Sequence, residues 1–435
     1  MQVAQQLLRR IEDKSAHVGV MGLGYVGLPL GMEFARKGFR VSGFEIRNDL
    51  IRSLRRGHSH VADVPSTMVR DMTRAGRFRA TGRFDEIKRL DAVIICVPTP
   101  LRKSKEPDVS YILAAAREIS RHLRRGQVIV LESTTYPGTT RELVLPLFEK
   151  KGLKVGRDFH LAFSPERVDP ANRTYRIFNT PKVVGGLSPL CTDLACRLYA
   201  QVVERVVPVS SSEAAEMVKL LENTFRAVNI ALVNEMTLMC HKLKLDVWEI
   251  IDAAATKPFG FMPFYPGPGI GGHCIPLDPQ YLAWKMRSMN FEPRFIELAG
   301  VVNAAMPEYV VRRLSDLFNR RARALKGARV LLLGVAYKPN VSDVRESPAL
   351  DVVALLQDEG CRVSYHDRWV PSIQVGGKCF SSSPLNRATL KGADVTVILT
   401  AHSGIDYAWV LRASRLVFDA RNALQGALSP KLFRL

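Results

Sequence analysis

Short apolar segments and amphipathic segments alternate along the first part of the chain. HVGVMG at 17–22, DAVIICV at 91–97 and QVIVLEST at 127–134 contain nearly continuous apolar runs, and the segments between them place apolar residues at helical spacing. Continuous apolar runs of this length are typical of strands that are buried on both faces. The pattern predicts a parallel sheet with helices on both of its faces, over residues 1–208.

The middle of the chain follows a helical period. Segment 210–243 contains neither proline nor glycine and repeats apolar residues at helical spacing, so it predicts one long helix. Ser210 and Glu213 have the spacing of a capping box at its start. A loop rich in proline and glycine follows at 258–279, and helical sequence then continues to about 324. We therefore expect a helical central region over residues 209–324.

The alternation of strands and helices starts again in the last part of the chain. RVLLLGVA at 329–336 and DVTVILT at 394–400 are apolar runs of strand length, and Ser347 followed by Pro348 is a typical helix start between them. Residues 325–435 should therefore form a second sheet-based domain. The predicted fold class is α/β, with two Rossmann-like doubly wound domains joined by the helical central region.

Composition narrows the class of protein without identifying it. The 435 residues are 47% hydrophobic and 24% charged, as in an ordinary globular protein, which excludes wholesale disorder. Seven cysteines are scattered without a CxxC pair, the pattern of a compartment where thiols stay reduced. Because no run approaches the roughly 18 apolar residues that span a bilayer, we expect a cytoplasmic protein without a membrane partner.

The charge balance indicates an anionic ligand. Lys plus Arg number 62 and Asp plus Glu number 42, which gives a formal net charge of +20. Nucleic acid, anionic lipid and phosphorylated small molecules would all fit this excess. A basic nucleic-acid-binding protein stays an alternative, but such surfaces interleave aromatic and basic residues, and the basic cluster at 312–323 has only Phe318 beside it. We expect no nucleic-acid partner.

A dinucleotide signature follows the first predicted strand. Gly22-x-Gly24-x-x-Gly27 stands between that strand and a helix, where glycines permit a tight turn and a close approach of the backbone to a pyrophosphate. Glu45, at the end of the next strand, is placed to accept a hydrogen bond from a ribose 2′-hydroxyl, which favours NAD over NADP. Thr99 and Thr134 follow later strands at the ligand-binding edge. The expected NAD contacts are Gly22, Gly24, Tyr25, Val26, Gly27, Glu45, Thr99 and Thr134.

The loop at 258–279 carries one cysteine, Cys274, and one carboxylate, Asp278, four residues apart. Four further motifs accompany this loop: GLGYVGLP at 22–29, SPERV at 164–168, KLLEN at 219–223 and YKPNVSDVRESP at 337–348. With these motifs, in this order, the chain resembles the UDP-glucose/GDP-mannose dehydrogenase family from about residue 17 to 425.

The resemblance implies a four-electron oxidation of the C6 alcohol of a nucleotide sugar to a carboxylate, with two NAD molecules reduced per turnover. An aldehyde cannot give up a second hydride until a nucleophile adds to its carbonyl, and Cys274 fits that role through a thiohemiacetal and then a thioester. Lys219 and Asn223 are four residues apart and share one helix face. By resemblance they point at C6 and stabilise developing oxyanions.

The remaining catalytic roles also come from the resemblance. Asp278 would orient water or assist the lysine as a base in the first oxidation, and Glu166 would activate water against the thioester with help from Thr134. Arg345 would reach the cofactor, and Lys338 the substrate. The second Rossmann-like domain would hold the UDP group. The expected substrate contacts are Glu166, Arg167, Val168, Lys219, Asn223, Tyr265, Gly271 and Lys338.

Two positions depart from the glucose-oxidising branch of the family. Pro170 stands where that branch has a second glutamate, and Pro258 stands where it has an arginine that reaches a neighbouring subunit. The loop around Cys274 is instead similar to the branch that acts on UDP-N-acetylglucosamine, with Tyr265 and Gly271 along the sugar. UDP-glucose or another UDP-N-acetylhexosamine remain alternative substrates.

A different class, a two-electron hydroxyacid dehydrogenase, would share the glycine signature but needs no cysteine loop and no second strand-helix domain. The long helix resembles the dimer-forming core of the family, so a homodimer or higher homo-oligomer is expected. We expect no metal site, because the pair His273 and Cys274 has no second cluster at ligand spacing.

Overall fold

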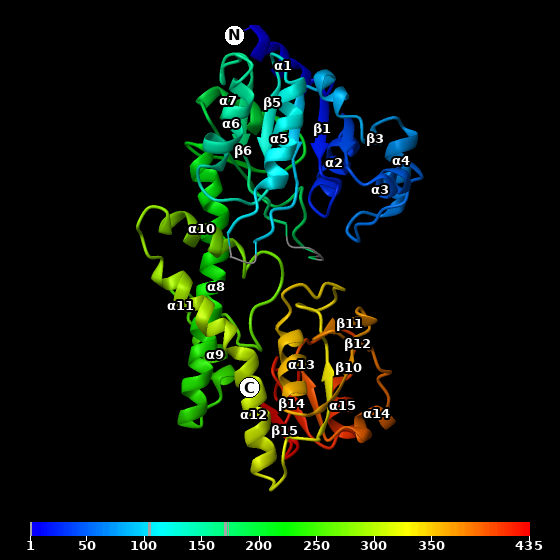
Figure 1. Cartoon of the computed structure of the whole chain (residues 1–435), viewed down its shortest axis with the longest axis vertical. Coiled ribbons are helices and arrows are strands. Elements are labelled where there is room, and N and C mark those ends of the chain that lie inside the picture. The colour runs from blue at the N-terminus through cyan, green and yellow to red at the C-terminus, as the bar shows by residue number, and fades with distance from the viewer. Residues whose placement is uncertain (1, 103–105, 169–171, 173) are drawn as a thin grey trace. The chain divides into compact units, whose positions relative to one another are not determined.

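The computed structural model describes residues 2–102, 106–168, 172 and 174–435, so Pro170 lies outside the described residues (Figure 1). Contacts divide the chain into two compact units. The first contains Met1–Glu222 with Gln280–Asn290, and the second contains Asn223–Pro279 with Phe291–Leu435. The sequence predicts three domains with boundaries at residues 208 and 324, and this three-part division stays a prediction.

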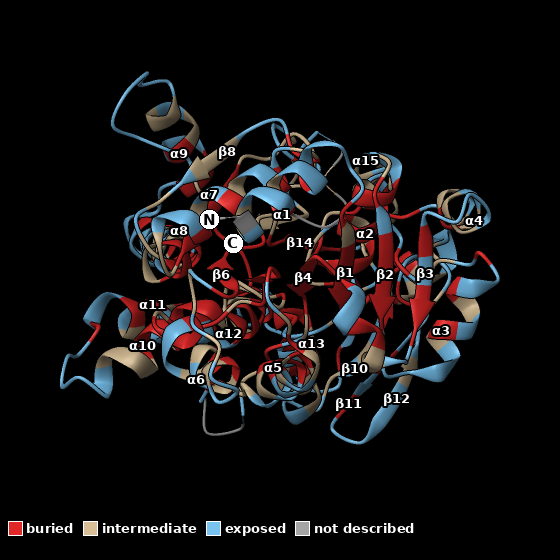
Figure 2. Cartoon of the chain, turned by 90° about the horizontal axis from the view of Figure 1, so that it is seen from above, coloured by how far each residue is buried: buried red, intermediate tan, exposed pale blue. Residues whose placement is uncertain are grey.

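The first unit is built on a sheet of eight strands in the order β3-β2-β1-β4-β5-β6-β7-β8. Its strands are β1 (His17–Met21), β2 (Arg40–Phe44), β3 (Phe78–Thr81), β4 (Ala92–Ile95), β5 (Val128–Leu131), β6 (His160–Phe163), β7 (Lys182–Gly186) and β8 (Val206–Pro208). Alternate residues of β4 enter two separate cores, Ala92 and Ile94 on one face and Val93 and Ile95 on the other. The sheet is therefore buried on both faces, as the apolar runs predict. Figure 2 shows β1 and β2 mainly in the colour of buried residues.

One pair of strands departs from the predicted parallel arrangement. Strands β6 and β7 pair antiparallel, whereas every other neighbouring pair of this sheet is parallel. A parallel pair needs a crossover connection, usually a helix. The described residues between β6 and β7 contain no helix, so the chain returns in the opposite direction.

Helices cover the two faces of this sheet, and the glycine signature leads into the second of them, α2. They are α1 (Gln2–Glu12), α2 (Gly27–Arg36), α3 (Asn48–Arg55), α4 (Ser66–Arg74), α5 (Ser110–His122), α6 (Leu145–Glu149) and α7 (Pro189–Tyr199), with a 3-10 turn at Phe84–Arg89 and a π-helical turn at Thr140–Val144. Helix α7 begins with a side-chain cap, because the Ser188 hydroxyl accepts a hydrogen bond from the Cys191 backbone N–H at 3.3 Å.

The central part of the chain is helical, as predicted. Its helices are α8 (Ser212–Leu243), α9 (Val247–Ala255), α10 (Asp278–Arg287), α11 (Arg294–Ala304) and α12 (Met306–Asn319). The predicted capping box at Ser210 is wrong. The helix starts two residues later, and Ser211 accepts the hydrogen bond from Ala214 N–H at 3.1 Å. Glu213 instead pairs with Arg141 at 2.5 Å.

The second unit contains the second doubly wound sheet, and the predicted fold class is confirmed. Its five strands are all parallel, in the order β10-β9-β13-β14-β15. The strands are β9 (Arg329–Leu333), β10 (Arg362–His366), β13 (Val395–Ile398), β14 (Val417–Asp419) and β15 (Leu432–Arg434), and the helices are α13 (Pro348–Asp358), α14 (Arg387–Gly392) and α15 (Tyr407–Ala413). A separate hairpin joins β11 (Ser372–Val375) to β12 (Lys378–Ser381). Across the described residues, we find no helix that combines the length and apolar character needed to span a membrane.

Candidate functional site

The glycine signature lies between β1 and α2, and its three glycines meet different surroundings. A Cβ atom on Gly22, whose φ is +88°, would lie 2.6 Å from the Cys96 carbonyl oxygen, and one on Gly27 would lie 2.0 Å from the Gly22 carbonyl oxygen. A Cβ atom on Gly24 would meet nothing within 4 Å. The fold itself requires Gly22 and Gly27, whereas Gly24 faces open space that a pyrophosphate can approach.

Glu45 follows β2 directly and lies beside this loop. Its carboxylate accepts backbone hydrogen bonds from Leu23 at 3.3 Å and from Ile46 at 2.9 Å. The side chain is only partly buried, so it keeps acceptor capacity for a ribose hydroxyl. Tyr25 and Val26 complete the turn into α2, and Tyr25 is exposed. Together the loop and the carboxylate fit a dinucleotide.

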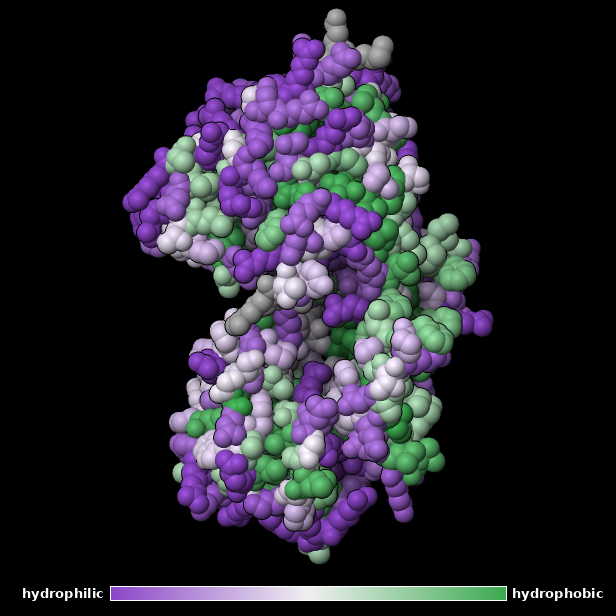
Figure 3. All heavy atoms as spheres, turned by 180° about the vertical axis from the view of Figure 1, so that it is seen from behind, coloured by the Kyte–Doolittle hydropathy of each residue, from purple (hydrophilic) through white to green (hydrophobic). Residues whose placement is uncertain are grey.

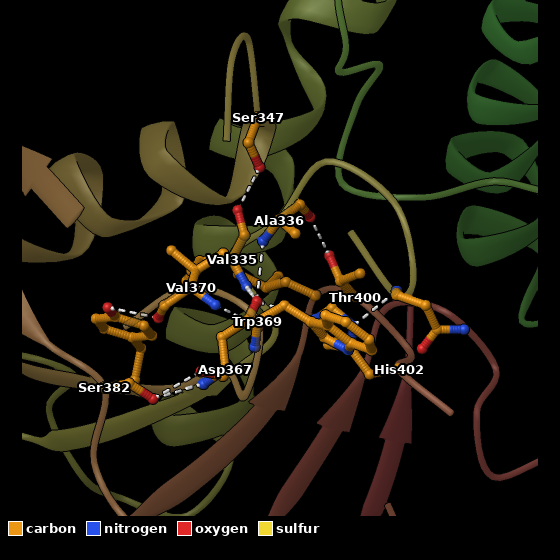
Figure 4. A network of polar contacts seen from close by, with 12 residues as sticks. Val335, Ala336, Ser347, Asp367, Trp369, Val370, Ser382, Thr400 and His402 are labelled. Atoms are coloured by element: carbon orange, nitrogen blue, oxygen red, sulfur yellow. Dashed lines mark hydrogen bonds and ion pairs between the residues drawn. The ribbon is translucent and has the colours of Figure 1, made fainter. Parts of the chain in front are cut away.

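The loop after β9 occupies the same place in the second sheet but has lost the signature. Its sequence GVAYKP at 334–339 keeps the first glycine and replaces the other two by Ala336 and Pro339. Asp367, after β10, stands where Glu45 stands in the first sheet. Its carboxylate accepts from the backbone N–H groups of Val335 at 2.9 Å and Ala336 at 3.1 Å (Figure 4).

A buried histidine closes this second position. The Nε2 atom of His402 lies 2.9 Å from the Asp367 carboxylate, and both side chains are fully buried. Because His402 Nδ1 accepts the Asn340 backbone N–H at 3.0 Å, Nε2 carries the proton and donates to Asp367. Burial alone would raise the pKa of Asp367, but the hydrogen bonds from His402 and from the backbone keep this pKa below its ordinary value. Asp367 therefore organises its own loop.

Glu166 is the centre of a buried polar cluster in the first unit. It follows β6, and its Oε1 atom accepts the backbone N–H groups of Arg167 at 2.8 Å and Val168 at 2.6 Å. Lys219, on α8, donates its ammonium to the Glu166 backbone carbonyl. Burial would raise the pKa of Glu166, but the Lys182 ammonium and these hydrogen bonds hold it below its ordinary value. The carboxyl group is therefore ionised at neutral pH.

Sequence reasoning missed two members of this cluster, Lys182 and Glu132. The Lys182 ammonium, at the start of β7, lies 2.7 Å from Glu132 Oε1 and 3.4 Å from Glu166 Oε2. Glu132 follows β5 and also accepts the Tyr199 hydroxyl at 2.6 Å. The sequence does contain one signal: Glu132 directly follows the apolar run of β5, and Lys182 directly precedes the apolar run of β7. Charged residues are rare at such buried positions unless they have a partner.

The predicted threonines lie in the same unit. Thr134 is two residues after Glu132 and is partly buried. Thr99 is buried, and its backbone carbonyl accepts the hydroxyl of Tyr281 from α10. Arg167, predicted to contact substrate, forms an ion pair with Glu222 at 2.6 Å. The structure thus brings together Glu166, Lys219 and Arg167.

Cys274 belongs to the second unit and is partly buried. Its backbone carbonyl accepts the Asp278 N–H at 2.8 Å, so the cysteine lies one turn before the start of α10. Asp278 is buried and accepts a hydrogen bond from the side-chain amide of Asn223. The predicted pair Asn223 and Asp278 is therefore in direct contact, and α8 carries Asn223 one turn after Lys219.

The cysteine loop packs on the loop that follows β9. A Cβ atom on Gly271 would lie 2.7 Å from the Glu346 carbonyl oxygen, and one on Gly272 would lie 2.7 Å from the Tyr337 ring. The Gly272 N–H also donates to the Arg345 carbonyl at 3.2 Å. The glycines of GGHC therefore let two backbones meet closely, and the candidate nucleophile is built against the loop that carries the two predicted cations.

Those cations have neighbours of their own. The Arg345 guanidinium is bound to the Asp343 carboxylate at 2.6 Å, and the Lys338 ammonium lies 5.8 Å from the centre of the Tyr337 ring. Tyr265 has different surroundings, because its hydroxyl donates to Asp252 at 2.8 Å. Its ring also stacks on Trp248 of α9. Gly271 and Tyr265 thus contact different elements of the same unit.

His273 precedes the cysteine and is the residue that raises the question of a metal. Burial lowers its pKa, and the nearby Arg345 lowers it further. A search of the described residues finds no group of three or more His, Cys, Asp or Glu side chains arranged to hold a metal ion.

The first doubly wound sheet carries a dinucleotide loop, and the second carries an altered copy of that loop on which the cysteine loop packs. These features define a dehydrogenase with two unlike Rossmann-type domains. Three family models match in chain order. They are the NAD binding domain of the UDP-glucose/GDP-mannose dehydrogenase family over residues 16–203, the central domain over 213–305 and the UDP binding domain over 331–426.

Individual relatives cover almost the whole chain. UDP-N-acetyl-D-glucosamine 6-dehydrogenase from Pseudomonas aeruginosa is 35% identical over 392 residues, which are 90% of this chain and 91% of that protein. UDP-N-acetyl-D-mannosamine dehydrogenase from Pyrococcus horikoshii is 33% identical, with 94% and 96% covered. The solved structure of UDP-D-ManNAc dehydrogenase from Pyrococcus horikoshii superposes with a TM-score of 0.87 at 32% identity, covering 96% of this chain and 98% of that chain.

The chain belongs to the UDP-glucose/GDP-mannose dehydrogenase family. It is an NAD-dependent nucleotide-sugar dehydrogenase, with an NAD binding domain at its N-terminal end and a UDP binding domain at its C-terminal end.

Proposed function

We propose that the chain oxidises the C6 hydroxyl of UDP-N-acetylglucosamine to a carboxylate, in two successive two-electron steps. The observation that carries the reaction type is the position of Cys274 in a loop whose glycines pack on the loop after β9, one turn before the buried pair Asp278 and Asn223. A dehydrogenase that stopped at the aldehyde would have no use for a nucleophile held in this way.

In the first oxidation, the side chains around C6 handle a proton and a developing negative charge. The glycine signature and Glu45 would hold NAD, which would supply the acceptor for a hydride from C6. Asp278 takes the proton of the C6 hydroxyl, directly or through a water molecule that it orients. The Lys219 ammonium and the Asn223 amide stabilise the oxyanion that forms on the way to the aldehyde.

In the second oxidation, Cys274 makes a covalent bond to the sugar. Its thiolate adds to the aldehyde carbon, and the alkoxide oxygen takes a proton, which gives a thiohemiacetal. A second NAD would supply the acceptor for a hydride from C6, and loss of the hydroxyl proton to water would leave a thioester. Glu166 then removes a proton from water, the hydroxide adds to the thioester carbon, and the C–S bond breaks to release the acid and the thiolate.

The remaining predicted contacts complete the proposal. The cofactor is bound by residues of the first unit and by Arg345 of the second unit. The residues of the first unit, in addition to the glycines of the signature, are Tyr25, Val26, Glu45, Thr99 and Thr134. Thr134 also helps to hold the water that Glu166 activates. The substrate is held by Arg167, Val168, Tyr265, Gly271 and Lys338 in addition to the catalytic groups.

The choice of sugar rests on the cysteine loop and on the relatives. The Pseudomonas aeruginosa relative is named for N-acetylglucosamine and the Pyrococcus horikoshii relative for N-acetylmannosamine, and both sugars carry an acetamido group at C2. Pro258, in place of the arginine of the glucose-oxidising branch, supports an acetamido sugar. UDP-N-acetylmannosamine is the second candidate, favoured by the likeness to the Pyrococcus horikoshii protein.

A panel of UDP-sugars with NAD tests the proposal. We expect UDP-N-acetylglucosamine to have the largest kcat/KM and to yield two NADH per sugar consumed. One NADH per sugar, with free aldehyde as the product, would contradict the thioester mechanism. A larger kcat/KM for UDP-N-acetylmannosamine or UDP-glucose would overturn the choice of sugar and leave the mechanism standing.

We further propose that the chain assembles as a homodimer or a higher homo-oligomer through the helical central region. Helix α11 is fixed to α8 because Asn303 bonds to the Ala227 carbonyl at 3.1 Å and to Asn234 at 2.9 Å. Figure 3 shows hydrophobic side chains gathered over these helices. The exposed apolar side chains of α8 and α11 in this unit are Phe225, Leu232, Met236, Met239, Leu243, Phe295, Leu298 and Val301.

Apolar side chains gathered on one exposed face are typical of a protein interface. Sedimentation of the unaltered chain and of Leu298→Glu tests the assembly. We expect the variant to sediment as a smaller species, and an unchanged sedimentation coefficient would exclude this face. The cytoplasmic location expected from the cysteine pattern stays a prediction.

A further inference from the structure

Lys182 is a buried ammonium that the proposed mechanism does not use. It is 5% exposed, and it lies between two carboxylates from different strand ends, Glu132 at 2.7 Å and Glu166 at 3.4 Å. A buried charge destabilises the folded state unless it is well paired. The arrangement therefore needs a reason beyond packing.

We propose that Lys182 is a positioning residue that holds the Glu166 carboxylate in its ionised form and in its orientation, and that Glu132 in turn holds Lys182. This inference rests on the proposed function, in which Glu166 removes a proton from water. Lys182 touches no reacting atom in this scheme and acts through Glu166.

The two oxygens of Glu166 are held by different groups. Oε1 accepts the backbone N–H groups of Arg167 and Val168, whereas Oε2 faces the Lys182 ammonium. Two backbone donors on one oxygen leave the plane of the carboxylate to be set by the other oxygen. Lys182 supplies that second attachment, so its loss would free the side chain to rotate as well as remove a positive charge.

The net charge of the cluster formed by Glu132, Lys182 and Glu166 suits a base that takes up a proton and then releases it. Burial raises the pKa of Glu132, and the Lys182 ammonium and the Tyr199 hydroxyl oppose that rise. In the state with Glu132 and Glu166 ionised and Lys182 protonated, the three groups carry one net negative charge. When Glu166 takes a proton from water, a complete ion pair between Lys182 and Glu132 remains. When Glu166 is protonated, the charges of Lys182 and Glu132 therefore still neutralise each other. Without Glu132, protonation of Glu166 would leave the Lys182 ammonium buried without a counter-charge.

Other titratable groups also face the cluster, and each affects its pH dependence. They are Lys219 from α8, Tyr199 from α7, Cys96 after β4 and the neighbouring Arg167. Burial raises the pKa of the Tyr199 hydroxyl and of the Cys96 thiol, so both are neutral. Burial would lower the pKa of Lys182, but the two carboxylates hold it above its ordinary value, so it stays charged.

The signs of two substitutions separate this role from simple structural support. Lys182→Met removes the positive charge beside a buried carboxylate, so the pKa of Glu166 should rise. Glu132→Gln removes a negative charge from the other side of Lys182, so the pKa of Glu166 should fall. A group that only supported the fold would lower activity and thermal stability without moving the two pH profiles in opposite directions.

The experiment measures acid release from the UDP-sugar as a function of pH in the full chain, with Lys182→Met, Lys182→Arg and Glu132→Gln. The rising limb should move to higher pH by about one unit or more in Lys182→Met, return in Lys182→Arg, and move to lower pH in Glu132→Gln. Mass spectrometry should also find acyl-Cys274 accumulating in Lys182→Met, because hydrolysis has slowed. The matched control is Lys154→Met, at an exposed lysine of the same unit, which should leave the limb in place.

An unmoved limb in Lys182→Met, or shifts of the same sign in both variants, would overturn the inference. If Lys182→Met does not fold, the direction of the shift in Glu132→Gln decides the question alone. Failure of the proposed function looks different, because the unaltered chain would then yield no acid from any UDP-sugar.

Discussion

Substituting the glycines of the cofactor loop one at a time should separate ligand binding from folding. In Gly24→Ala the new methyl group meets no protein atom within 4 Å, and the backbone φ lies outside the left-handed region. Stability should therefore hold, or rise by about 0.4–1 kcal/mol because the unfolded chain loses freedom. In Gly27→Ala the methyl group lies 2.0 Å from the Gly22 carbonyl oxygen, so the helix start must shift.

The expected magnitudes follow from these distances. Overpacking of this kind costs about 1–3 kcal/mol, and a unit of this size loses about 2–4 °C of Tm for each kcal/mol. Gly24→Ala should instead raise the Kd for NAD by about tenfold or more, since the methyl group fills the space that the pyrophosphate approaches. At an NAD concentration of 100 times the original Kd, the stabilisation by NAD would fall from about 2.7 to about 1.4 kcal/mol.

Calorimetric titration with NAD and thermal melting with and without NAD measure both quantities. The matched control is Gly392→Ala in α14, where the methyl group also meets nothing within 4 Å and φ is compatible. This variant should keep or slightly raise its Tm and should keep its NAD affinity. The reasoning is refuted if Gly24→Ala loses as much Tm as Gly27→Ala, or if it binds NAD as tightly as the unaltered chain.

Three further predictions concern α8 and the cysteine loop. Burial raises the pKa of Glu216 from 4.5 to about 7, so the folded state binds this proton more tightly than the unfolded chain. The resulting stabilisation of the fold is complete below pH 4.5 and is lost as the pH rises through 7. The free energy of unfolding in urea should therefore fall over this pH range in the unaltered chain and change less in Glu216→Gln. Cys274→Ala should abolish acid formation, and detectable UDP-uronic acid from this variant would exclude the thioester. Gly272→Ala places a methyl group 2.7 Å from the Tyr337 ring at a φ of +94°, so Tm and kcat should both fall, and an unchanged kcat would show that the contact between the loops does not position the cysteine.

Local patterns predicted most of the regular structure. The runs around Val93 and Ile129 are continuous and apolar because both faces of the sheet are buried, and that property is visible within a few residues of sequence. The direction of β7 is different, because pairing with β6 depends on the path of the connection rather than on periodicity. The helix cap was misplaced because consecutive serines offer the same hydroxyl, and only the geometry selects Ser211.

The candidate site divides in the same way. Glu166 and Lys219 stand in short recognisable motifs, and the structure finds them in contact. Glu132 and Lys182 are 50 residues apart, and no local pattern relates them. Their pairing is set by the order of strands β5, β6 and β7, which places the ends of separate strands beside one another. A charged residue at the end of a buried strand is the only local trace of such a pair.

The closed position at Asp367 and His402 has a consequence for the timing of the reaction. Among the described residues, the loop after β1 has the open glycine signature, and its counterpart after β9 is occupied by side chains of the chain itself. A four-electron oxidation would then use one binding place for two cofactor molecules in succession. In the proposed mechanism, the half-oxidised sugar would stay bound while the first NADH leaves and a second NAD binds. Under the proposed mechanism, exchange of cofactor would be a step inside each catalytic cycle, and the covalent bond to Cys274 would be one means of keeping the intermediate from escaping.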